Sequence, residues 1–95
     1  MITPMEKKMN EILNILTEEC AEVIQAISKT QRFGMDNTNP FSAETNREHL
    51  EQEIGDLLTM IDLLFVRGII NEENILKAQQ RKIEKLKIWS KIYEE

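Results

Sequence analysis

Hydrophobic residues recur every three or four positions in three long segments of the chain, at residues 9–27, 50–64 and 75–93. This spacing places them on one face of an α-helix. Residues 35–40, between the first two segments, have no such period and are rich in turn-forming side chains. The pattern therefore predicts an all-α fold of three long helices, with a loop between the first two.

Helix-start signals stand before each segment. Thr3 with Glu6, and Thr45 with Glu48, have the spacing of a capping box, and Asn71 can cap the third helix. The first two segments are each followed by a glycine that suits a helix C-terminus, Gly34 and Gly68. We expect an antiparallel bundle of about three helices that forms a single domain over residues 1–95.

The composition narrows the class of protein. Three Gly and two Pro in 95 residues are too few for a sheet protein with many turns. Cys20 is the only cysteine, which excludes an internal disulfide, and its place on the first apolar stripe predicts a small core residue. No apolar run reaches the ~20 residues of a membrane span, and residues 1–10 are too charged for a secretory signal. We expect a cytoplasmic protein without a membrane partner.

The charge distribution bears on partners. The net charge is −5, which argues against a nucleic-acid partner because such proteins usually carry a basic footprint. Residues 77–91 differ from the rest, with six basic side chains and one acidic side chain. The third helix also has a wide apolar face, and we expect a second subunit to cover part of it. The bundle would then be completed in a homodimer or homotetramer.

Four carboxylates interrupt helix faces that would otherwise be apolar. They lie on two lines with steps of three and four residues: Ile12, Ile15, Glu19, Glu22 and Ala26, and then Glu53, Asp56, Met60 and Leu63. Residues at this spacing share a helix face. In an antiparallel hairpin, one register pairs Glu19 with Asp56 and Glu22 with Glu53. The same register pairs four apolar residues at the next level, Ile15 with Met60 and Ile12 with Leu63.

Converging carboxylates repel one another and require neutralisation by protons or by a cation. A donor set made only of oxygen suits Mg²⁺, or Mn²⁺, better than zinc. A ferritin-like di-iron site would need Glu-x-x-His on two helices, and His49, the only histidine, does not fit that pattern. We expect His49 to be exposed in the first turns of the second helix. The sequence contains neither a P-loop nor an EF-hand motif.

The acids belong to two motifs, Glu18-Glu19-Cys20-Ala21-Glu22 and Glu53-Ile54-Gly55-Asp56. Together these resemble the E-E-x-x-E … E-x-x-D pattern of the MazG-like nucleotide pyrophosphohydrolases, an all-α family. The resemblance covers about residues 13–64. It implies Mg²⁺-dependent hydrolysis of a nucleoside triphosphate to the monophosphate and pyrophosphate, in nucleotide-pool control or house-cleaning.

The resemblance also assigns roles to single residues. It makes Glu19, Glu22, Glu53 and Asp56 metal ligands, and it makes Glu18 a catalytic, water-orienting group. An exposed position on the polar face explains Glu18 equally well. Cations that would bind substrate phosphates are Lys29 and Arg32, to which Lys82 and Lys85 of the third helix would add; solvated surface charge is the alternative for each. Aromatic candidates for base stacking, which would equally suit a core, are Phe33, Phe41, Trp89 and Tyr93.

Two other functions stay open at this point. A non-catalytic helical module would dock its basic third helix on an acidic partner, although such a module has no reason to align four acids inward. A phosphoribosyl-ATP pyrophosphohydrolase would share the fold, and the context of the motifs is closer to that of the nucleotide-cleaning enzymes.

Overall fold

The computed structural model describes residues 1–38 and 40–94 of the chain. These residues form three helices, α1 (Pro4–Phe33), α2 (Asn46–Val66) and α3 (Glu72–Trp89). The only strand-like pairing among them is an isolated bridge between Thr38 and Thr45. The prediction of an all-α fold is confirmed. None of the described helices combines the length and the apolar character that are needed to cross a membrane.

The helices begin where their capping residues predict. The Thr3 hydroxyl accepts a hydrogen bond from Glu6 N at 3.1 Å, and the Glu6 carboxylate accepts one from Thr3 N at 3.2 Å. Thr45 and Glu48 form the same reciprocal pair before α2. The Asn71 side chain accepts from Asn74 N and caps α3. These bonds satisfy backbone donors that have no partner within the helix.

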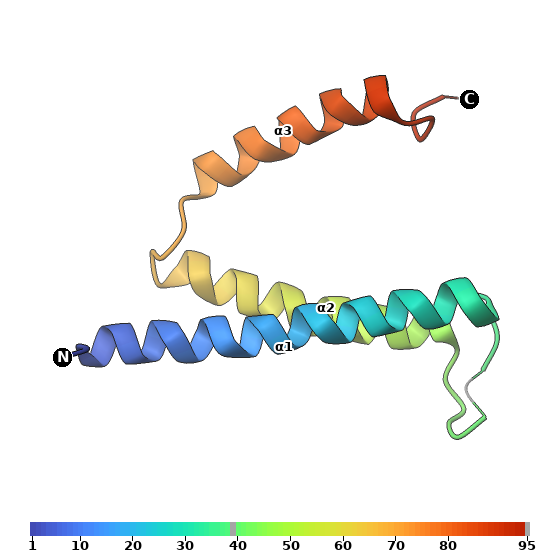
Figure 1. The fold of residues 1–95 in the computed structure, drawn as a ribbon, viewed down its shortest axis with the longest axis horizontal. Coiled ribbons are helices and arrows are strands. Elements are labelled where there is room, and N and C mark those ends of the chain that lie inside the picture. The colour runs from blue at the N-terminus through green and yellow to red at the C-terminus, as the bar shows by residue number, and fades with distance from the viewer. Residues whose placement is uncertain (39, 95) are drawn as a thin grey trace.

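Helices α1 and α2 pack as an antiparallel hairpin (Figure 1). Its core cluster consists of buried Ile12, Met60 and Leu64, against which lie Ile15, Leu16, Leu63, Ile69 and Ile70. All four apolar residues of the predicted register are therefore in one cluster. Ala26 is buried farther along α1, with 1% of its surface exposed.

The loop between α1 and α2 is anchored to both helices. Arg47 Nε donates to an Asp36 carboxylate oxygen at 3.0 Å, and this contact lowers the pKa of Asp36. Backbone bonds from Asn46 N to Asn37 O at 3.0 Å and from Arg47 N to Met35 O at 2.8 Å hold the same segment. The start of α2 is thereby tied to the residues that follow α1.

Helix α3 extends away from the hairpin (Figure 1). The radius of gyration is 17.0 Å, whereas a compact chain of this length would have ~12 Å. A single chain therefore does not close the bundle by itself. The helix ends at Trp89, so the prediction that its apolar stripe continues through Ile92 and Tyr93 is wrong.

Candidate metal centre

Three carboxylates from the two helices of the hairpin converge. Glu19 of α1 and Glu53 and Asp56 of α2 each place an oxygen atom within 4.8 Å of the other two. Glu19 and Glu53 are half-buried and Asp56 is exposed. The group lies one helical turn from Ile15 and Met60 of the core, because the spacing that buries these residues also turns the acids inward.

The environment of Glu19 disfavours its negative charge. Partial burial removes water from this carboxylate, and the charges of Asp56, Glu53, Glu22 and Glu18 repel it, so that its pKa is raised. A cation bound among these oxygens would relieve both effects. The chemistry of the donor set, three carboxylates and no sulfur, fits a hard divalent cation such as Mg²⁺.

Two further acids of the motifs lie at the edge of this group. Glu22 is exposed and is outside the set of oxygens that lie within 4.8 Å of one another. Glu18 is also exposed. Both are near enough for their charges to raise the pKa of Glu19. The structure thus brings together three of the four predicted ligands, and the assignment of all four stays a prediction.

The sequence that forms this hairpin and its carboxylates also matches the model of a known protein family. The family model of the MazG nucleotide pyrophosphohydrolase domain matches residues 7–87 of the 95-residue chain. The chain belongs to the MazG family. Its domain is a nucleotide pyrophosphohydrolase domain, which is a hydrolase domain with a nucleotide substrate. No curated protein and no solved structure matches the chain.

In this MazG domain, His49 lies next to Glu53, one of the candidate metal ligands, and the sequence pattern did not predict this contact. Its side chain is half-buried, and the expectation of an exposed residue is wrong. Nδ1 lies 3.1 Å from a Glu44 carboxylate oxygen, and Nε2 lies 3.9 Å from Glu53 Oε1. Glu44 is itself held by Gln52 Nε2 at 2.8 Å. The sequence feature that could have predicted the contact is the spacing of four residues between His49 and Glu53, which puts both side chains on one face of α2.

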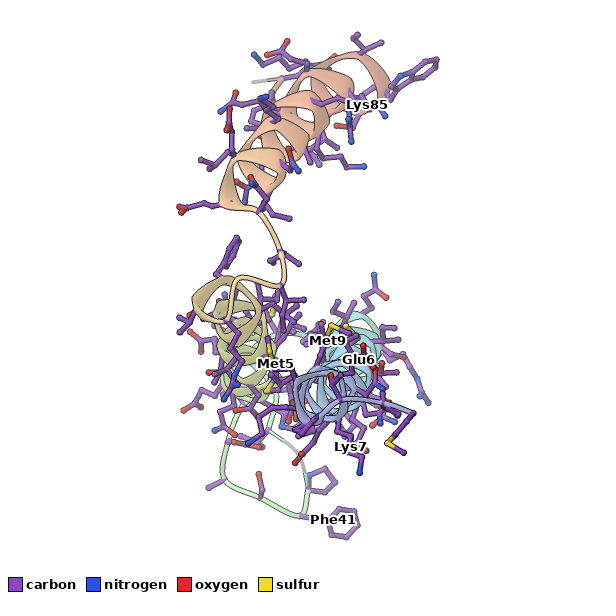
Figure 2. All side chains as sticks on the ribbon, turned by 90° about the vertical axis from the view of Figure 1, so that its left-hand side faces the viewer. Met5, Glu6, Lys7, Met9, Phe41 and Lys85 are labelled. Atoms are coloured by element: carbon purple, nitrogen blue, oxygen red, sulfur yellow. The ribbon has the colours of Figure 1, made fainter. Side chains whose placement is uncertain are left out.

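The predicted phosphate-binding cations do not all lie near the carboxylates. Lys29 is half-buried and lines a cavity at the end of α1. The Arg32 guanidinium lies over the Phe33 ring, 5.0 Å from its centre. Lys82 and Lys85 are exposed on α3, and Figure 2 shows Lys85 well away from the hairpin. Both lysines belong to α3, which extends away from the hairpin that carries the carboxylates (Figure 1).

Cys20 is exposed, and the prediction that it is a core residue of the MazG domain is wrong. Leu13 and Ile27, on the same stripe of α1, are 39% and 41% exposed. The neighbouring line through Ile12 and Ala26 faces α2 instead. This second apolar stripe of α1 is thus covered only in part by this chain.

Proposed function

We propose that this MazG domain is a Mg²⁺-dependent nucleoside triphosphate pyrophosphohydrolase. It would cleave ribo- or deoxyribonucleoside triphosphates to the monophosphate and pyrophosphate, in nucleotide-pool control or house-cleaning. The observation that carries this proposal is the convergence of Glu19, Glu53 and Asp56 inside the domain that defines the family.

The residues that would hold the metal are Glu19, Glu53 and Asp56, with Glu22 as the fourth ligand predicted from the motif. The charge of Glu22 acts on Glu19 and raises its pKa, which places this carboxylate near the group. When bound, Mg²⁺ supplies charge neutralisation and polarises the phosphate oxygens, and Mn²⁺ would serve in its place.

The other polar groups of the site are proposed to position the reactants. Glu18 immediately precedes Glu19 in α1 and is exposed, so it would orient the attacking water from the solvent side. Lys29 and Arg32 lie farther along α1 and would balance negative charge on the substrate. His49, through its place between Glu44 and Glu53, would restrict the orientation of the Glu53 carboxylate.

A second copy of the chain is proposed to complete the enzyme as a homodimer or homotetramer. Apolar residues are exposed on both α1 and α3, among them Leu13, Ile88 and Trp89, and clustered exposed apolar side chains of this kind often mark a contact between proteins. Docking of α3 from another protomer on the hairpin would cover both surfaces. It would also carry Lys82 and Lys85 toward the phosphates.

The reaction is tested by product analysis. The purified protein is incubated with Mg²⁺ and a panel of nucleoside triphosphates, their deoxy forms and phosphoribosyl-ATP. A monophosphate and pyrophosphate from the triphosphates support the proposal. Turnover of phosphoribosyl-ATP alone would identify the related histidine-pathway reaction, and diphosphate with orthophosphate would contradict the proposed bond cleavage. No turnover would favour the helical interaction module.

The carboxylate group is tested by a matched pair of variants. Glu53→Gln removes one charged oxygen ligand and should lower kcat/KM by about 100-fold or more, the scale of losing one group that stabilises transition-state charge. It should also weaken the shift in melting temperature that Mg²⁺ produces. Glu51→Gln makes the same chemical change at an exposed position of α2 outside the group. Equal effects of the two variants would show that Glu53 has no special role.

A further inference from the structure

The loop between α1 and α2 contributes one carboxylate that is held by the first turns of α2. Glu44 Oε1 lies 3.1 Å from His49 Nδ1, and Glu44 Oε2 accepts a hydrogen bond from Gln52 Nε2 at 2.8 Å. Its side chain is 31% exposed, whereas that of Asp36, another acid of the same loop, is 79% exposed. Glu44 is therefore fixed in the fold through both of its carboxylate oxygens.

His49 connects Glu44 to the carboxylate group. A carboxylate oxygen only accepts hydrogen bonds, so His49 Nδ1 carries the proton and donates it to Glu44. This bond sets the orientation of the imidazole ring, whose other nitrogen, Nε2, lies 3.9 Å from Glu53 Oε1. The three side chains thus form a continuous series of contacts from the loop to a candidate metal ligand.

Glu53 is confined by its neighbours. Its side chain is only 15% exposed. The His49 ring is one neighbour, and the carboxylates of Glu19 and Asp56 are the others. A long side chain loses conformational entropy when a single rotamer is selected. Contacts that already restrict Glu53 lower this cost when its carboxylate binds a cation.

The ring restricts Glu53 without competing for its oxygen atoms. A distance of 3.9 Å from His49 Nε2 to Glu53 Oε1 is a contact and is too long for a hydrogen bond. The lone pairs of the carboxylate therefore stay available to a cation. Residues that orient metal ligands in this way matter for binding, and the loss of one typically weakens metal affinity ~10- to 100-fold.

We propose that Glu44 is a positioning residue of the metal centre and acts on the ligand Glu53 through His49. The inference rests on the metal site of the proposed function and adds to it a residue of the loop. Glu44 is not itself among the converging carboxylates of the described residues. The affinity of the hairpin for a divalent cation therefore depends on the loop as well as on the two helices.

Cation binding by the substrate-free protein tests this role. Mn²⁺ is titrated into the protein, and the unbound ion is measured by electron paramagnetic resonance. Glu44→Ala removes both contacts of the carboxylate and should raise the dissociation constant by about tenfold or more. Glu44→Gln keeps an acceptor for His49 Nδ1 and should retain most of the affinity. An unchanged dissociation constant in Glu44→Ala would overturn the proposal.

Asp36→Ala is the matched control for a purely structural role of the loop. Asp36 is also a loop carboxylate bound to α2, but it accepts from Arg47 Nε, at 3.0 Å, rather than from His49. Its removal should leave the dissociation constant of Mn²⁺ unchanged. Melting temperatures in the presence of a chelator show whether each variant is folded. Equal losses of affinity in Asp36→Ala and Glu44→Ala would show that any anchor of the loop suffices, and would overturn the specific role of Glu44.

A double-mutant cycle tests the route through His49. His49→Ala should weaken Mn²⁺ binding at least as much as Glu44→Ala does. The double variant should bind no more weakly than His49→Ala alone, because Glu44 reaches Glu53 through the imidazole ring. Fully additive losses would contradict this route.

Activity separates this proposal from the hydrolase proposal. The predicted ligands all remain in Glu44→Ala, so its loss of activity should shrink as the Mg²⁺ concentration rises. A loss that is the same at every Mg²⁺ concentration would contradict the positioning role. A protein that shows the expected Mn²⁺ affinities but hydrolyses no triphosphate would support the role of Glu44 while the hydrolase proposal fails. A wild type that binds no divalent cation would overturn the role of Glu44 together with the metal centre.

Discussion

At the scale of the residue, Glu19 shows how the helix period creates the chemistry of this site. Glu19 lies on the same face of α1 as the buried Ile12 and Ala26, so its charged side chain is partly buried. Asp56 and Glu53 approach it from α2. Desolvation and repulsion both favour the protonated form, which raises the pKa of Glu19. Without a cation, ionisation of Glu19 works against the fold.

The pH dependence of stability tests this conclusion. Since the folded-state pKa of Glu19 is raised above its ordinary value, its contribution to stability is fully present below the pKa that Glu19 has in the unfolded state. The contribution is lost as the pH rises through the folded-state pKa, because the native state then gives up a proton that it binds more tightly than the unfolded state does. Glu19→Gln removes this loss. In a metal-free buffer with a chelator, the variant should melt above the wild type at neutral pH, and the difference should shrink toward pH 4.

Glu51→Gln, on the exposed side of α2, provides the comparison. It should leave the pH profile of the melting temperature unchanged. A Glu19→Gln profile parallel to that of the wild type would mean that the three carboxylates do not share one electrostatic environment in solution.

At the scale of the element, the turn between α1 and α2 depends on one glycine. Gly34 has φ +92° and ψ 148°, and a Cβ atom there would lie 3.2 Å from Asn37 Nδ2. Gly34→Ala should therefore lower the free energy of unfolding by about 1–3 kcal/mol, the cost of holding a non-glycine residue in this region. Urea unfolding followed by circular dichroism measures it.

A second glycine supplies the opposite expectation. Gly55 lies inside α2, and a Cβ atom there would have no neighbour within 4 Å. Gly55→Ala should raise stability by about 0.5–1 kcal/mol through helix propensity. Destabilisation by both variants to the same extent would contradict a special role for the conformation of Gly34.

The same elements show what the sequence can and cannot predict. The capping boxes follow from local hydrogen bonds, and the clustering of Ile12, Ile15, Met60 and Leu63 follows from the helix period; both are present in the structure. Periodicity does not tell which of two adjacent stripes of α1 is covered, so it predicts a core position for Cys20, which is in fact exposed. The position of His49 depends on its contact with Glu44. Glu44 lies in the loop, where the sequence has no hydrophobic periodicity from which its position could be predicted.

At the scale of the whole molecule, the single chain buries few of its apolar side chains. Within the described residues, the buried hydrophobic side chains are only Ile12, Ala26, Met60 and Leu64. Trp89 is 83% exposed on a helix that projects from the hairpin. Hydrophobic burial is the dominant favourable contribution to folding, and this chain gains little of it alone. Association through α3 would supply the missing hydrophobic burial. The position of α3 against a second subunit depends on contacts between chains, which the pattern of one sequence does not encode locally.

Size-exclusion chromatography with light scattering tests the assembly. The wild type should have the mass of a dimer or tetramer of the 11.2 kDa chain. Leu86→Glu puts a charge on the apolar face of α3 and should yield a monomer that has lost activity and Mg²⁺-dependent stabilisation, because an unpaired buried carboxylate opposes docking. Gln80→Glu adds the same carboxylate at an exposed position of α3 and should keep the oligomer. A wild type that is fully active as a monomer would show that one hairpin suffices, and Lys82 and Lys85 would then have no part in binding the substrate.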